Sequence, residues 1–185
     1  MLYLKQGRYS KAEPLLQRAL SICEQQKGLG TYYLATLLND LALLYFKQGR
    51  YSEAEPLYQR ALEIYEQQLG LEHPDTASTL NNLATLYLNQ GRYTESQPLF
   101  EQALSIRENS LGLEHPDVAT TLNNLAMLYS EQGRYSQAEL LLQQVLVIRE
   151  KVLGPEHPDT MVTVENYADV LGKIEKGGGS SKKSI

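Results

Sequence analysis

Apolar positions along the chain follow the 3.6-residue period of amphipathic helices. One stripe occupies positions i, i+3, i+4 and i+7 of a helix: Leu80, Leu83, Ala84 and Tyr87. A second stripe follows: Leu99, Ala103, Leu104 and Ile106. Gly91 separates the two stripes, and Leu111-Gly112 comes after the second, where glycine suits a helix end. The pattern predicts a pair of helices, with Pro74 in the first turn of one and Thr94 as the N-cap of the other.

This helix pair recurs with a period of 42 residues. The tripeptide Gly-Arg-Tyr begins at Gly7, Gly49, Gly91 and Gly133. The tetrapeptide Glu-His-Pro-Asp begins at Glu72, Glu114 and Glu156. Asn-Asn-Leu-Ala begins at Asn81 and Asn123, and the variant Asn-Asp-Leu-Ala at Asn39. Because neither helix can bury its stripe alone, we expect stacked pairs that cover one another, as in solenoids whose repeats touch only their neighbours.

The residues within a unit resemble the tetratricopeptide signature. The matching positions are Leu80, Leu83, Ala84, Tyr87, Gly91, Tyr93, Ser96 and Phe100. Periods near 42 also occur in HEAT and armadillo repeats, but the Gly-x-Tyr turn favours the tetratricopeptide interpretation. From Met1 to about Lys173 the units closely resemble repeats of kinesin light chain and its bacterial relatives. The resemblance implies an all-α, right-handed superhelical solenoid of antiparallel helix pairs, with about four repeats and partial units at both ends.

The two ends of the array differ from its middle. We expect a single repeat array over residues 1–175, followed by a flexible Gly/Ser/Lys tail over residues 176–185. The chain begins within a unit, and its last helix, from Pro158, has no second helix after it. That helix carries an apolar set that could dock on the Ala12–Ile22 surface of another copy, head-to-tail or as a swapped dimer. The set comprises Val164, Tyr167, Val170, Leu171 and Ile174.

Charge and composition narrow the partners. The formal net charge is −5. We therefore do not expect the basic stripe with which a protein binds nucleic acid or an anionic membrane. No apolar run approaches the roughly 20 residues that span a bilayer, and the start does not read as a signal peptide. Cys23 is the single cysteine, which favours a reducing compartment. A cytoplasmic protein is the resulting prediction, with protein, peptide or self-association as its partners.

The resemblance implies that the first helix of each pair lines a concave peptide-binding groove. Carried over position by position, the candidate residues are Asn39, Phe46, Lys47, Asn81, Asn82, Thr85, Leu88, Asn89, Asn123, Asn124, Met127 and Asn166. Asn amides both donate and accept, so they could bind an extended peptide backbone or bridge neighbouring repeats. The groove positions hold two lysines, Lys47 and Lys173, against four acids: Asp40, Glu131, Glu165 and Asp169. The preference of kinesin light chains for acidic motifs is therefore not carried over.

No catalytic or cofactor site is predicted. His73, His115 and His157 occupy equivalent turns a full repeat apart, too far for one metal ion, and are expected to close the turn between repeats. Cys23 lies near Ala19 and Ile22, as a buried small residue would. Two functions remain: a scaffold that binds a peptide or protein in its groove, and a structural array that associates with itself. Neither needs a cofactor, and an enzyme is not expected.

Overall fold

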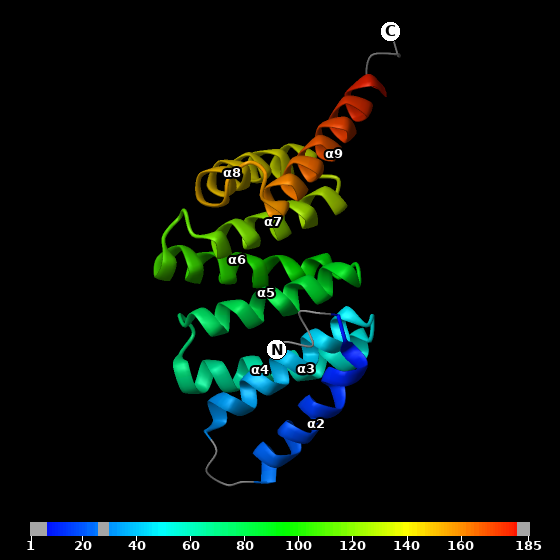
Figure 1. Ribbon diagram of the computed structural model, residues 1–185. Helices are drawn as coiled ribbons and strands as arrows, with labels where there is room; N and C mark the ends of the chain where they lie inside the picture. The colour runs from blue at the N-terminus through cyan, green and yellow to red at the C-terminus, as the bar shows by residue number, and fades with distance from the viewer. Residues whose placement is uncertain (1–6, 26–29, 181–185) are drawn as a thin grey trace. The chain divides into compact units, whose positions relative to one another are not determined.

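The computed structural model describes residues 7–25 and 30–180, and every regular element within them is an α-helix (Figure 1). The chain divides into two compact units, one up to Arg92 and one from Tyr93. The first unit contains α2 (Tyr9–Gln25), α3 (Thr31–Lys47), α4 (Tyr51–Leu69) and α5 (Pro74–Asn89). The second contains α6 (Tyr93–Leu111), α7 (Pro116–Glu131), α8 (Tyr135–Leu153) and α9 (Pro158–Ser180). The succession of helices that the repeated apolar stripes predicted is confirmed.

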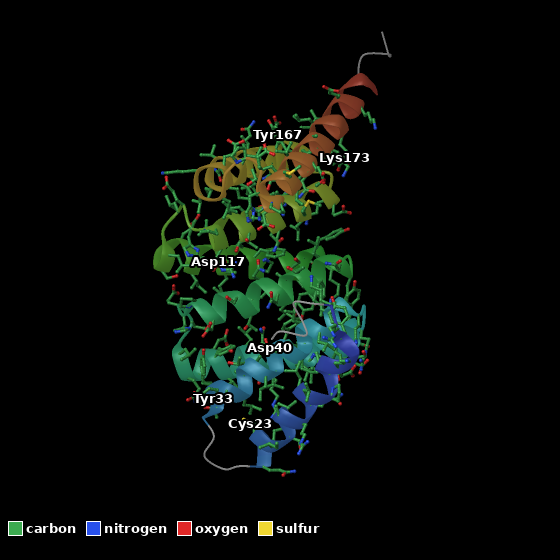
Figure 2. The ribbon with its side chains drawn as sticks, viewed as in Figure 1. Cys23, Tyr33, Asp40, Asp117, Tyr167 and Lys173 are labelled. Carbon is green, nitrogen blue, oxygen red and sulfur yellow. The ribbon has the colours of Figure 1, made fainter. Side chains whose placement is uncertain are left out.

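A histidine caps the first helix of three repeats. His73 Nδ1 accepts the backbone N–H of Asp75 at 3.1 Å, ahead of Pro74 at the first position of α5. The equivalent bonds run from Asp117, labelled in Figure 2, to His115 at 3.1 Å and from Asp159 to His157 at 3.2 Å. Each histidine satisfies an N–H that has no partner inside the helix. The histidines therefore close turns between helices, as their position predicted.

The second helices begin at the tyrosine of Gly-Arg-Tyr. Gly91 has a φ of +73°, in the left-handed region that non-glycine residues seldom adopt. The helix that follows already includes Tyr93, so the prediction of Thr94 as its N-cap is wrong. The equivalent helices α4 and α8 have Arg50 and Arg134 as their N-cap residues. The chain therefore enters the helix at Tyr93, two residues earlier than an N-cap at Thr94 would place it.

Each of these arginines also ties one repeat to the preceding one. Arg50 lies 4.0 Å from the centre of the Tyr45 ring and donates to Glu13 Oε1 at 2.8 Å. In the second unit Arg134 stacks on Tyr129 at 4.0 Å and donates to Gln97 Oε1 at 3.2 Å. The partner of Arg50 is a carboxylate, so this contact is an ion pair, whereas the partner of Arg134 is a neutral amide.

Alanines at the helix contacts allow close packing in the first unit. One buried cluster joins α3 and α4: Ala35, Leu38, Ala61 and Tyr65. Ala35 and Ala61 are fully buried, so a larger side chain at either site would overpack the contact. Cys23 of α2 is 8% exposed, which confirms its prediction as a buried small residue.

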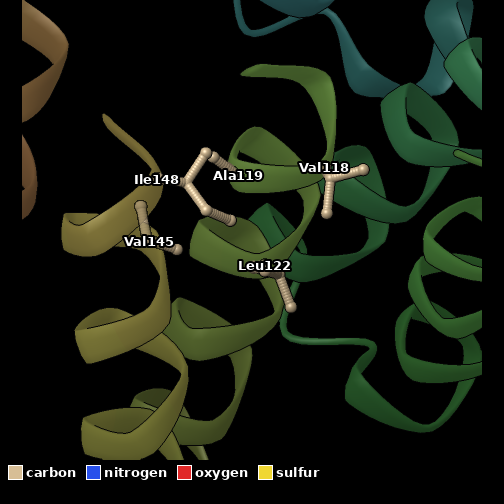
Figure 3. Packing of buried hydrophobic residues seen from close by; sticks show 5 residues of the cluster. All are labelled: Val118, Ala119, Leu122, Val145 and Ile148. Carbon is tan, nitrogen blue, oxygen red and sulfur yellow. The ribbon is translucent and has the colours of Figure 1, made fainter. Parts of the chain in front are cut away.

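Buried clusters in the second unit likewise join its helices. One lies between α7 and α8 and consists of Val118, Ala119, Leu122, Val145 and Ile148 (Figure 3). Another joins α9 to the pair through Ala126, Ala138, Leu142 and Val170. The last helix continues to Ser180, so residues 176–180 are helical where a flexible tail was expected. Residues 181–185 of that expected tail, and Met1–Gln6 of the expected partial first helix, lie outside the described residues.

Candidate functional site

In the first unit an asparagine bridge joins the first helices of two repeats. Asn82 Nδ2 on α5 donates to Asn39 Oδ1 on α3 at 3.3 Å, and Thr79 Oγ1 donates to the same oxygen at 3.5 Å. Both asparagines are half-buried. Asn81, by contrast, is only 7% exposed, and its carbonyl accepts the Thr85 hydroxyl at 2.7 Å. Asn39 and Asn82 thus share one face of the unit, while most of Asn81 is hidden from a ligand.

The C-terminal ends of α3 and α5 carry the rest of the first unit's candidates. Phe46 is half-buried, with its ring 5.7 Å from that of Tyr51, and the Lys47 ammonium lies 5.8 Å from its centre. Leu88 is half-buried, and the exposed Asn89 donates to the Thr85 carbonyl at 2.8 Å. Lys47 and Asn89 are therefore accessible, and Phe46 and Leu88 offer partial apolar surfaces.

The second unit repeats the asparagine bridge. Asn166 Nδ2 on α9 donates to Asn123 Oδ1 on α7 at 3.4 Å, and Asn124 and Met127 are half-buried. Lys173, labelled in Figure 2, donates to Ser130 Oγ at 3.3 Å and pairs with Asp169 at 2.8 Å. The hydrogen bond to Asp169 raises the pKa of the Lys173 ammonium. This lysine is already engaged, which removes it as a ready site for a ligand carboxylate.

One of the four acids at the groove positions is not on the surface. Asp40 occupies the position that Asn82 and Asn124 hold in later repeats, yet it is only 6% exposed. Burial disfavours its charged form and raises the pKa of the Asp40 carboxyl. Burial, with a contribution from Asp40, also raises the pKa of the Tyr58 phenol on α4. Asp40 is therefore not accessible to a ligand in the groove, and the prediction that placed it among the groove acids is wrong.

The helix proposed for self-association is partly used inside its own unit. Val170 is 1% exposed and packs with Ala126, Ala138 and Leu142. Tyr167 and Ile174 pack against the same cluster, and Gln143 donates to the Tyr167 hydroxyl at 2.9 Å. Leu171 is half-buried, whereas Val164 is 49% exposed. Of the five residues, Val164 has the most accessible apolar surface, and a charge at Val170 would disrupt packing rather than report on association.

Over residues 7–25 and 30–180, no three His, Cys, Asp or Glu side chains gather closely enough to hold a metal ion. Over the same residues, none of the helices combines the length and apolar character needed to cross a bilayer.

Antiparallel helix pairs with left-handed glycine turns and bonds from repeat to repeat define a helical-repeat protein. The tetratricopeptide repeat family matches residues 1–67, 33–91 and 75–151. The chain belongs to this family, and its repeats are of the kinesin light chain-like type. The predicted fold, an all-α tetratricopeptide-like solenoid, is confirmed at the level of fold class. Repeats of this family are generally non-enzymatic scaffolds for protein–protein interaction.

Solved structures show the same fold. BtubC (BKLC) from P. vanneervenii is 27% identical, with a TM-score of 0.82 over 94% of this chain and 69% of that chain. A kinesin light chain-type protein of Podosopora anserina with nearly identical TPR-like repeats is also 27% identical, with a TM-score of 0.77 over 97% of this chain and 85% of its own. A second structure of such repeats, 24% identical with a TM-score of 0.71, supports the fold alone. None of the curated proteins matches the chain.

Proposed function

We propose that the chain is a protein-interaction module that binds an extended segment of a partner along the first helices of its repeats. The observation that carries this proposal is the repeated asparagine bridge, Asn39–Asn82 in one unit and Asn123–Asn166 in the other. An amide carries two N–H donors and an acceptor oxygen, so the donor asparagine of each bridge keeps an N–H and its oxygen for a ligand. A half-buried, oriented amide costs a ligand less entropy than a free surface side chain does.

The neighbouring side chains indicate the chemistry of the ligand. Phe46 and Leu88 in the first unit and Met127 in the second are half-buried, and such surfaces suit apolar side chains of a partner. Lys173 is paired with Asp169, and Lys47 is the remaining groove lysine. The proposed ligand is therefore an extended segment with apolar side chains and little net negative charge, recognised mainly through its backbone.

The test separates the groove from the rest of the surface. Short random-sequence peptides on an array are probed with the intact protein, and the strongest binders are measured against Lys47→Ala and Asn89→Ala. Both side chains are exposed, so we expect unchanged melting curves and binding weakened about three- to tenfold for each variant. Gln67→Ala, on the exposed surface of α4, serves as the matched control. Peptides that bind both groove variants as tightly as the unaltered protein would contradict a groove on the first helices.

Self-association is a second candidate function, and one observation favours it. Met161, Val162 and Val164 near the start of α9 are 51%, 48% and 49% exposed. In earlier repeats the position of Val164 holds Leu80 or Leu122, both buried. Sedimentation velocity over a wide concentration range tests the idea, with Val164→Glu as the variant. Association that Val164→Glu abolishes would support it, and a monomer at every concentration would exclude it.

A further inference from the structure

The second unit contains an apolar hollow outside the first-helix face. It has a volume of about 500 Å³ and lies among α6, α7 and α8. Buried Val118 and Leu122 contribute to its lining from α7. Leu113, Leu140 and Val147 line it too, yet they are 67%, 62% and 67% exposed. Single exposed apolar residues are ordinary on a protein surface, but three around one hollow form a patch of the kind that binds partners.

Leu140 and Val147 lie on one stripe of α8, because residues seven apart share a helix face. Gln144 lies between them on the same stripe and also lines the hollow. Two repeats earlier, the helix α4 has Pro56, Arg60 and Glu63 at these positions. The same framework therefore presents a polar stripe in the first unit and a largely apolar one in the second.

In the first unit an ion pair spans the equivalent place. Arg60 Nη1 on α4 lies 2.7 Å from Glu24 Oε1 on α2, which forms an ion pair from one second helix to the next. The residue equivalent to Glu24 in the second unit is Glu108 on α6, which lines the hollow. The residue equivalent to Arg60 is the neutral Gln144. Among the residues that the structure describes, no lysine or arginine pairs with Glu108.

The edge of the hollow therefore has an unmatched negative charge. The other carboxylate that lines it, Glu114, already pairs with Lys151 at 2.6 Å. A partner's cation beside the apolar patch could pair with Glu108, in the way that Arg60 pairs with Glu24 in the first unit. An apolar side chain in the hollow would at the same time cover Leu140 and Val147, and removal of such surface from water favours binding.

We propose that this hollow is a docking site for a partner-protein segment that presents a large apolar side chain next to a lysine or arginine. The apolar side chain fills the space between α6 and α8, and the cation pairs with Glu108. This surface is formed mainly by second helices and shares no residue with the first-helix face of the proposed function. The two sites can therefore be tested independently.

The test uses a phage-displayed library of short random-sequence peptides selected on the intact protein. Enriched peptides are synthesised and measured against Gln144→Arg/Val147→Glu, which restores the charges found at Arg60 and Glu63 in the first unit. Both residues are exposed, so melting curves should be unchanged. We expect the enriched peptides to pair an apolar residue with a neighbouring lysine or arginine. Their affinity for the double variant should fall at least about tenfold, because the hollow is closed and Glu108 is already paired.

Glu108→Gln adds a second readout. It should weaken the same peptides and reduce the salt dependence of their binding, while Glu101→Gln, at an exposed position of α6 away from the hollow's lining, should do neither. The proposal is overturned by a selection without enriched peptides, by peptides rich in acidic residues, or by binding that ignores Gln144→Arg/Val147→Glu. It is overturned as well if the unaltered protein sediments as a dimer that the double variant dissociates, because the hollow would then be an interface between copies.

Discussion

The two units use an equivalent buried position of their second helices in different ways. In the first unit the position holds Cys23 on α2 and, on α4, Tyr65, whose hydroxyl is 2.9 Å from Thr36 Oγ1 on α3. In the second unit it holds Arg107 and Arg149. Arg149 donates to the Asp159 carbonyl at 2.8 Å and to Thr163 Oγ1 at 2.7 Å, both on α9. The tyrosine thus bonds to the helix before its own, and the arginine to the helix after it.

The difference shows how a repeat framework holds a buried charge. Burial lowers the pKa of both Arg107 and Arg149, because a guanidinium loses hydration inside the protein. The penalty is offset where the next first helix supplies a carbonyl and a threonine hydroxyl as acceptors. Tyr65 has no charge to satisfy and needs only one hydroxyl partner. The threonine at the start of α9 should therefore matter more than its equivalent on α5.

The largest expected effect is the loss of that acceptor. Thr163→Val keeps the shape of the side chain but removes the oxygen that accepts from Arg149, so we expect a loss of about 2–3 kcal/mol in the free energy of unfolding. Thr79→Val is the matched change on α5, where the hydroxyl donates to the Asp75 backbone carbonyl at 3.0 Å, lies 3.5 Å from Asn39 Oδ1 and meets no buried guanidinium. It should cost about 1 kcal/mol. Urea unfolding of both variants measures the difference, and equal losses would contradict the special role of the arginine.

The second expected effect concerns the buried acid of the first unit. The pKa of Asp40 is raised by burial, so its ionised form is disfavoured in the folded chain relative to the unfolded one. The destabilisation is absent below the unfolded pKa, near the ordinary value of 3.8, and develops as the pH rises through the unfolded and then the folded pKa. Asp40→Asn should therefore raise the melting temperature near neutral pH, by a few degrees at most, and this gain should vanish in acid.

Melting curves from acid to neutral pH test this expectation. Asp169→Asn, on the surface of α9, is a control that removes an exposed acid from the same protein. A melting temperature for Asp40→Asn that stays equal to that of the unaltered protein at every pH would show that burial does not penalise the Asp40 charge.

Much of the fold could be predicted from sequence because three markers repeat in one register. Pro74 and Gly91 act locally, through a fixed φ and a left-handed turn, so they identify helix limits without knowledge of the packing. The burial of Val170 could also have been predicted, since its equivalents Leu86 and Leu128 are core positions. The sequence overestimates the free apolar surface of the last helix, because Val170 packs against Ala138 and Leu142 of α8.

The candidate site was less predictable, because a side chain's partner depends on the neighbouring repeat. From the sequence, the asparagines could either bind a ligand or bridge neighbouring repeats. The hydrogen bond between Asn82 and Asn39 shows that they bridge repeats, and the second amide N–H of Asn82 leaves ligand binding compatible with that role. The hollow beside Glu108 was missed altogether. Its signal was present in the aligned repeats, where Gln144 and Val147 replace a charged pair, but its meaning depends on seeing Arg60 meet Glu24.

The smallest expected effect is the coupling between those two charges. Arg60 and Glu24 are 47% and 41% exposed at their side chains, so a double-mutant cycle with Arg60→Gln and Glu24→Gln should give about 0.2–1 kcal/mol, decreasing with added salt. Gln144→Arg should create a coupling of similar size with Glu108, measured by the cycle with Glu108→Gln, because the two helices hold equivalent positions. No coupling in the second unit would mean that its second helices are spaced differently, and the added arginine would then not close the hollow. A coupling that matches the first unit would make Gln144→Arg a switch for that surface, with a stability cost too small to confuse binding measurements.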